Sequence, residues 1–289
     1  MKYSVFTVGT PDYNLEDTVK KLKEFGYDGV EWRVTKAMTE EPAEIPPRDR
    51  WYWAYNKSTV EVDTILQEAD NIKALCDKYG IEISALATYL QASQIDKIEE
   101  VLKAAQKMGC SKIRVNVPGY NGEINYKELF AKSVEEFKAV ELLAKKYNVK
   151  VNFEIHHGTI VSSVSAAYRF ASNFDSRYIG VIHDAGNMVH EGFEQYKMGL
   201  ELLGEYLDHV HIKNTKWELK EVKEEEQHVW EANWCPLKKG QAKLDVLVGA
   251  LKSIGYDGYL SFEDFSTEST TDEKLKGNIE YIKDLVAKA

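Results

Sequence analysis

Cysteine is scarce in this chain, with three among 289 residues. Cys76, Cys110 and Cys235 lie too far apart for a Cys-x-x-Cys motif, and their odd number is not that of a disulfide framework. This pattern is typical of a protein in a reducing compartment, and it disfavours a structural zinc site built from thiolates. We therefore expect free thiols and a cytoplasmic location.

Long apolar runs and basic clusters are also missing. The N-terminal segment "MKYSVFTVGTPDYN" is broken by Pro11 and Asp12, which disfavours a signal peptide, and no stretch approaches the ~20 apolar residues that span a bilayer. The formal net charge is -10, and no local cluster of Lys and Arg offsets it. Such a surface repels a phosphate backbone, so the sequence predicts neither a nucleic-acid partner nor a membrane partner.

Short apolar runs alternate with amphipathic helical patterns along the whole chain. This alternation predicts a parallel sheet, because parallel neighbours need a crossover connection. Eight strand–helix units are the number that a closed (β/α)8 barrel contains, so we predict the TIM-barrel form of the α/β class. We also predict a single domain over residues 1–289. An open doubly wound sheet is disfavoured, because the first strand–helix turn has no G-x-G-x-x-G phosphate loop. The predicted strands span residues 3–9, 28–34, 81–88, 111–117, 149–156, 178–185, 207–214 and 258–265.

Two long loops, 35–61 and 214–242, follow predicted strands, which places them on the C-terminal face where barrel active sites are assembled. Two interpretations of their aromatic residues stay open. The side chains can pack the loops into small satellite clusters, or some of them can form a stacking wall and lid over a ring-shaped ligand. Five of the six tryptophans lie in these loops: Trp51, Trp53, Trp217, Trp230 and Trp234.

Polar side chains gather at the ends of the last four predicted strands. Because strand side chains alternate between faces, we expect one polar residue of each strand to point inward at a similar depth. An apolar barrel core would not tolerate these charges unless they were paired or bound to a metal ion. One imidazole and three carboxylates suit a divalent cation, Mn²⁺ first, with Mg²⁺, Co²⁺ or Zn²⁺ as alternatives. The predicted metal ligands are Glu154, Asp184, His211 and Glu263.

The histidines and one early glutamate add to this pattern. All seven histidines lie at or after position 156. By strand alternation His183 points outward and is expected to be structural, and His190 and His228 are expected in loops or at the surface. Glu31, in the second predicted strand, is a further inward candidate for which a structural role is the alternative.

With these motifs the chain resembles the xylose isomerase-like TIM barrels, the sugar isomerase and epimerase group that includes ketose 3-epimerases and inosose dehydratases. The resemblance covers essentially the whole chain. Two departures stand out: Asn187 replaces the histidine that contacts substrate in the ketose 3-epimerases, and Asn214 replaces an aspartate after the lysine. The first departure argues against simple ketohexose 3-epimerisation. The matching motifs are "FEIHHG", "HDAGNM", "HVHIKN", "GYDGYLSFED" and "CPLKKG".

The resemblance implies a divalent-metal-dependent sugar isomerase or epimerase. It implies proton abstraction next to the carbonyl of a keto sugar, a sugar phosphate or an inosose, through a metal-stabilised enediolate. Glu154 and Glu263 are expected to be the acid/base pair on opposite faces of the substrate. Substrate contacts are expected from His156, Lys213, Asn187, Arg114, Asn116 and Trp53.

Three other functions are weighed against this one. A lyase on the same scaffold, which dehydrates an inosose or eliminates from a 3-keto glycoside, would share the metal ion and the first base. A non-catalytic sugar-binding protein would not need two carboxylates facing one carbon. A nuclease of the endonuclease IV branch would need histidines from early strands. The expected partner is a small-molecule sugar, and the resemblance is compatible with a homodimer or a homotetramer.

Overall fold

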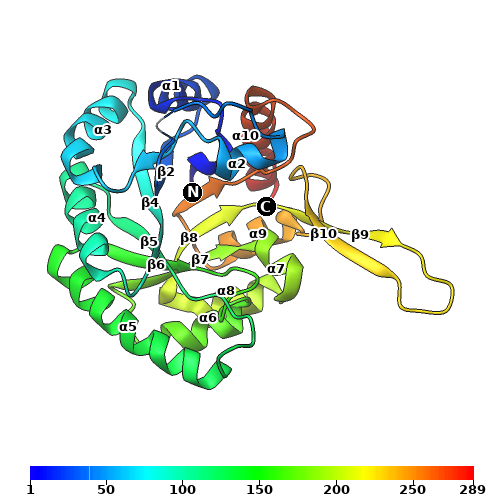
Figure 1. Cartoon of the computed structure of the whole chain (residues 1–289). Helices are drawn as coiled ribbons and strands as arrows, with labels where there is room; N and C mark the ends of the chain where they lie inside the picture. Colours follow the sequence, from blue (N-terminus) through cyan, green and yellow to red (C-terminus); the bar gives the residue numbers. More distant parts are fainter. Residues whose placement is uncertain (39) are drawn as a thin grey trace.

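The computed structural model describes residues 1–38 and 40–289, so position 39 of the predicted loop 35–61 lies outside the described residues. A closed barrel of eight parallel strands forms the centre of the molecule (Figure 1). The first strand pairs in parallel with both the second and the last, which closes the barrel and confirms the predicted (β/α)8 TIM barrel. The barrel strands are β1 (Lys2–Phe6), β2 (Gly29–Thr35), β4 (Glu82–Gln91), β5 (Lys112–Asn116), β6 (Lys150–Glu154), β7 (Ile179–Asp184), β8 (Leu207–Ile212) and β11 (Tyr259–Phe262).

Helices surround the barrel on its outside (Figure 1). Local sequence explains their ends: the side chain of Asn14 accepts a hydrogen bond from Asp17 N at the start of α1, and Gly26, with φ 82°, ends that helix in the left-handed region. Thr270 and Glu273 form a capping box at the start of α10. The outer helices are α1 (Leu15–Phe25), α3 (Ile65–Tyr79), α4 (Ile95–Met108), α5 (Tyr126–Tyr147), α6 (Val164–Ala171), α8 (Tyr196–Leu203), α9 (Leu244–Ser253) and α10 (Thr271–Lys288). Among the described residues, no helix combines the length and the apolar character that crossing a membrane requires.

The main apolar core lies between the barrel and its helices, and the barrel interior holds many polar side chains. On the outer side Phe153 of β6 packs edge-to-face on Phe170 of α6, with 5.1 Å between ring centroids. Inside, at the starts of the strands, Lys112 Nζ lies 2.8 Å from Asp208 Oδ2. Gly180 faces this layer, where an added Cβ would lie 2.4 Å from Asn152 Oδ1, so only glycine fits there. The charged layer packs the N-terminal end of the barrel.

The prediction of a long loop over 214–242 is wrong in part. Two segments of it form an antiparallel hairpin, β9 (Thr215–Glu221) and β10 (Val229–Trp234). The hairpin projects away from the barrel (Figure 1). Its sequence alternates with period two, with Trp217 and Leu219 on one face and charged residues between them. The charged run at 218–227 is solvent-exposed apart from a half-buried residue 223, in keeping with the surface interpretation. The first long loop contains a short helix, α2 (Trp51–Ala54), and a two-residue strand, β3 (Val60–Glu61).

Asn214 organises the segment that follows the hairpin. Its Nδ2 donates to the carbonyls of Leu237 at 2.7 Å and Ala242 at 3.0 Å, and its Oδ1 accepts from the backbone N–H of Ala242 at 2.9 Å. Gly240 is confined by the same side chain, because an added Cβ would lie 2.0 Å from Asn214 Oδ1. An aspartate could not donate these two hydrogen bonds, which gives a physical reason for asparagine at this position.

We therefore expect Asn214→Asp to lower the free energy of unfolding by about 2–3 kcal/mol, because a buried carboxylate would face two carbonyl oxygens. Chemical denaturation measures this change. Asn121→Asp is the matched control, because Asn121 is exposed and its Oδ1 only accepts a hydrogen bond, from Glu123 N. Equal stability of the two variants would contradict this account of Asn214.

Candidate active site

The four predicted metal ligands meet at the C-terminal end of the barrel. Their ligand atoms all lie within 4.8 Å of one another, and all four residues are buried. The sheet register causes this, because Asp184 pairs with His211 across β7 and β8, while Glu154 ends β6 and Glu263 directly follows β11. His211 Nδ1 lies 3.1 Å from Glu154 Oε1, 3.6 Å from Asp184 Oδ2 and 4.0 Å from Glu263 Oε2.

The two carboxylate oxygens of Asp184 have different contacts. Its Oδ1 accepts a hydrogen bond from Asn187 N at 2.8 Å and so caps a short helix, α7 (Ala185–Glu191), that sequence analysis missed. Its Oδ2 is fully buried and accepts no well-aligned hydrogen bond, although Lys213 Nζ lies 3.0 Å away. A buried carboxylate oxygen of this kind, beside two more carboxylates and an imidazole, fits a divalent cation.

A fourth carboxylate contacts His211 at Nε2, the ring nitrogen that faces away from the cluster. Glu31 of β2 is fully buried, and both of its oxygens lie 3.2 Å from His211 Nε2. The same carboxylate also accepts from His209 Nε2 at 2.9 Å and from Ser261 Oγ at 2.5 Å. When Nε2–H of His211 donates to Glu31, Nδ1 is left with its lone pair toward the cluster. This arrangement of carboxylate and histidine is typical of metal-ligating imidazoles.

Electrostatics around His211 favour a cation. Burial alone would lower the pKa of His211, but Glu31 and Glu154 outweigh burial and raise that pKa well above its ordinary value. The pKa of Glu31 is held well below its usual range, because His211 and His209 together overcome the effect of burial. The negative charge that would keep His211 protonated is the charge that would also attract a metal ion.

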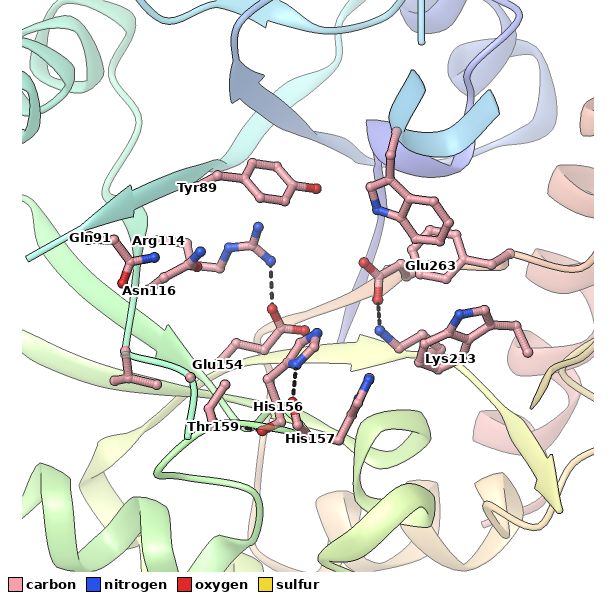
Figure 2. A pocket seen from close by; sticks show the side chains of 15 residues that line it. Tyr89, Gln91, Arg114, Asn116, Glu154, His156, His157, Thr159, Lys213 and Glu263 are labelled. Atoms are coloured by element: carbon pink, nitrogen blue, oxygen red, sulfur yellow. Dashed lines mark hydrogen bonds and ion pairs between the residues drawn. The ribbon is translucent and has the colours of Figure 1, made fainter. Parts of the chain in front are cut away.

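Two basic side chains neutralise the carboxylates from the cavity side (Figure 2). Arg114 Nη1 lies 2.6 Å from Glu154 Oε2, and Lys213 forms ion pairs with Glu263 and Asp184. Burial works to raise the pKa of Glu154, but Arg114 and His211 hold it well below its ordinary value. Burial raises the pKa of Glu263 to about 7, even though the Lys213 ammonium opposes the rise. The two glutamates therefore lie in contrasting environments.

A cavity of about 520 Å³ opens above this cluster, within the range of roughly 300–1,000 Å³ that small-molecule sites occupy. Five of the expected substrate-binding residues line it: His156, Lys213, Arg114, Asn116 and Trp53. Figure 2 shows Glu263 and Lys213 on one side of the cavity, Gln91 and Asn116 on the opposite side, and Glu154 with Arg114 between them. Sequence analysis missed further lining residues, among them Tyr89, Gln91, His157, Thr159 and Phe265.

Asn187 does not line the cavity. It is fully buried, and its Nδ2 donates to Glu154 Oε1 at 3.1 Å and to the carbonyl of Ile155 at 3.2 Å. The side chain lies behind Glu154, so its contacts support a role in positioning that carboxylate. Direct contact between Asn187 and substrate stays a prediction.

Among the histidines outside the cluster, one lies in a different place from the one predicted. His190 was expected in a loop or at the surface, but it lies on α7 and stacks on His157 with 4.1 Å between ring centroids. Burial lowers the pKa of both rings to about 4, so the stack is neutral at pH 7. His183 is fully buried against Tyr196, and His228 is exposed in the hairpin loop.

Some tryptophans of the two long insertions line the cavity, and others pack within their own segments. Trp53 and Trp234 line the cavity, as a stacking wall requires. Trp51 donates to the carbonyl of Pro46 and Trp217 donates to the carbonyl of Val189, so these two help to hold their own segments in place. Trp230 stays exposed on the hairpin.

The chain belongs to the xylose isomerase-like TIM barrel family, whose model matches residues 19–285. This match confirms the family predicted from the strand-end motifs. An inosose dehydratase from Clostridium perfringens is 24% identical over 159 aligned positions, and the match covers 52% of this chain and 52% of that protein. The chain thus spans about half the length of the curated relatives it matches.

Two solved structures share the fold over nearly the full length. An IolI protein with a bound zinc atom has a TM-score of 0.74 and 18% identity, covering 100% of this chain and 99% of that chain. A 3-keto-D-glucoside 4-epimerase from E. coli in its apo form has a TM-score of 0.72 and 15% identity, covering 98% and 99%. At these identities the likeness concerns the fold.

We expect Glu31→Gln to weaken divalent-metal binding about 10–100-fold, because the amide would no longer hold His211 in the orientation and tautomer that present Nδ1. Isothermal titration calorimetry with Mn²⁺ and with Zn²⁺ measures this effect. Glu205→Gln is the matched control, because Glu205 is exposed. Unchanged metal affinity in a folded Glu31→Gln protein would contradict the positioning role.

Proposed function

We propose that this protein is a divalent-metal-dependent sugar isomerase or epimerase. It would act by proton abstraction next to a carbonyl on a keto sugar, a sugar phosphate or an inosose. The observation that carries the proposal is the presence of two carboxylates, Glu154 and Glu263, in one buried cluster that also borders an open cavity. Glu154, Asp184, His211 and Glu263 would hold one ion, with Mn²⁺ the first choice and Zn²⁺ the principal alternative, given the zinc-bound IolI structure.

The two glutamates differ in how firmly they are held. Glu154 is fixed by Arg114 on one oxygen and by His211 and Asn187 on the other. Among the described side chains, Glu263 forms its one hydrogen bond with Lys213. The carboxylate with fewer partners can move toward a substrate carbon at lower cost, so Glu263 is assigned as the base that removes the proton.

When bound, the metal ion would act as a Lewis acid that polarises the substrate carbonyl. The chain's own residues then divide the work of moving the proton. Glu263 takes the proton from the carbon next to the carbonyl and later releases it to solvent. Glu154 would accept a proton from solvent and pass it to the opposite face of that carbon, which inverts the centre. His156, Arg114, Asn116 and Trp53 would hold the substrate in position from the cavity walls, where all of them lie.

A lyase is the second candidate, and the placement of Lys213 favours it. The Lys213 ammonium contacts Glu263 and borders the cavity, so it can protonate a hydroxyl or glycosidic oxygen as that group leaves the neighbouring carbon. The partial match to inosose dehydratases points to the same reaction class. Both candidates share the first step and differ in whether a leaving group departs.

The metal content of the purified protein tests the proposed cluster. We expect about one divalent ion per chain after loading with Mn²⁺, and strong loss of binding in His211→Ala, because that change removes the only nitrogen ligand of the set. Elemental analysis after gel filtration measures the ratio, with His228→Ala as the matched control at an exposed position. Failure to load the protein with any divalent ion would contradict the proposed function.

Exchange of solvent deuterium into substrate tests the proton transfer. Metal-loaded protein in D₂O should label the carbon next to the carbonyl in at least one member of a panel of keto sugars and inososes. Glu263→Gln should slow this labelling by about 10²–10⁴-fold, the usual contribution of a general base. Glu268→Gln is the control, because Glu268 pairs with Lys239 at the surface. Labelling that survives in Glu263→Gln would contradict the assignment of the base, and mass spectrometry of the products separates inversion from elimination.

A further inference from the structure

A second hollow, called the outer hollow below, adjoins the cavity and shares its aromatic lining. It has a volume of about 640 Å³, and three residues line both spaces: Trp53, Trp234 and Phe265. The rest of its lining is largely polar and comes from the two long insertions and the segment after β11, with Asp49, Arg50, Asn233 and Thr267 among them. The mechanism proposed above uses none of these four residues.

The shared aromatic residues form one continuous wall. The rings of Trp53 and Phe265 lie 4.8 Å apart between centroids, and those of Trp234 and Phe265 lie 5.5 Å apart. This wall directly borders the reacting groups, because Lys213 Nζ lies 4.7 Å from the centroid of the Trp234 ring and 3.0 Å from Asp184 Oδ2. A sugar ring that reaches the carboxylates therefore has the aromatic wall beside it.

The chemistry of the outer hollow matches a second ring. Trp53 is 44% exposed, so a large aromatic surface borders both hollows and is left for a ligand to cover. Aromatic faces stack on the C–H faces of sugar rings and on aryl groups, while carboxylate, guanidinium and amide groups hydrogen-bond hydroxyls at the ring edge. The inner cavity suffices for a single sugar ring, and the outer hollow would remain unused by a monosaccharide.

We propose that the substrate is a glycoside, whose reacting sugar occupies the inner cavity and whose attached ring occupies the outer hollow. The attached ring is either a second sugar or an aryl group, and the aromatic wall serves both. The proposal rests on the proposed function for the placement of the reacting sugar. It adds a recognition site built from Trp53, Trp234 and Phe265 on the wall and from Arg50 and Asn233 beyond it.

The test compares ligands that differ only in the attached ring. Metal-loaded protein is titrated with D-glucose, methyl β-D-glucoside, cellobiose, maltose and the two anomers of phenyl D-glucoside, and binding is followed by tryptophan fluorescence and calorimetry. We expect at least one two-ring ligand to bind at least tenfold more tightly than glucose and the methyl glucoside. Preference for the disaccharides or for the phenyl glucosides identifies which attached ring the hollow takes.

Two variants test whether the outer hollow causes the tighter binding of two-ring ligands. Thr267→Trp places a bulky side chain in the outer hollow, and Arg50→Ala removes a polar lining group from it, so either should reduce the affinity ratio of two-ring to one-ring ligands toward one. Trp230→Ala is the matched control, because this tryptophan is exposed on the hairpin and lines neither hollow. A two-ring ligand that binds no better than glucose, or an advantage that survives in Thr267→Trp, would overturn the proposal. Deuterium labelling of single-ring keto sugars would be unaffected by that failure, so the proposed function is judged separately.

Discussion

The hydrogen bonds between Glu31 and His211 are the interaction on which the site depends. They join β2 to β8 across the barrel interior and fix an imidazole that has carboxylates on both of its nitrogen atoms. Each of these groups is buried, so none could be tolerated alone. Three basic groups face four carboxylates in this interior: Arg114 faces Glu154, Lys213 faces Glu263 and Asp184, and His211 faces Glu31. A divalent ion would add positive charge where carboxylates outnumber basic groups.

The residues proposed to react and the aromatic residues proposed to contact the ligand come from different parts of the chain. The carboxylates and His211 lie on or directly beside barrel strands, whose register sets their mutual distances. The aromatic wall comes from α2, from the end of β10 and from the segment after β11, which lie outside the barrel. Such a division allows loops to change the substrate while the reacting groups stay in place.

The succession of eight strand–helix units was enough to predict the fold. Side-chain alternation along the strands predicted the four clustered residues, because a parallel barrel aligns the ends of its strands. Contacts across the barrel were not predictable in the same way. The pairing of Glu31 with His209 depends on how the barrel closes, and Tyr89 and Gln91 reach the cavity because β4 extends beyond a register shift. The hairpin was missed because its charged residues masked an alternation of period two. The position of His190 was predicted wrongly because α7 starts directly after Asp184, the last residue of β7, with no loop between strand and helix.

The charged layer at the other end of the barrel has a kinetic consequence. Asn152, Asp208 and Lys150 fill the space that Gly180 leaves at the starts of the strands, so the described residues pack that end of the barrel. A substrate and its product would therefore share the opening at the C-terminal face. A product that stays bound at the aromatic wall would block the next substrate, so product release can limit the turnover of such a site.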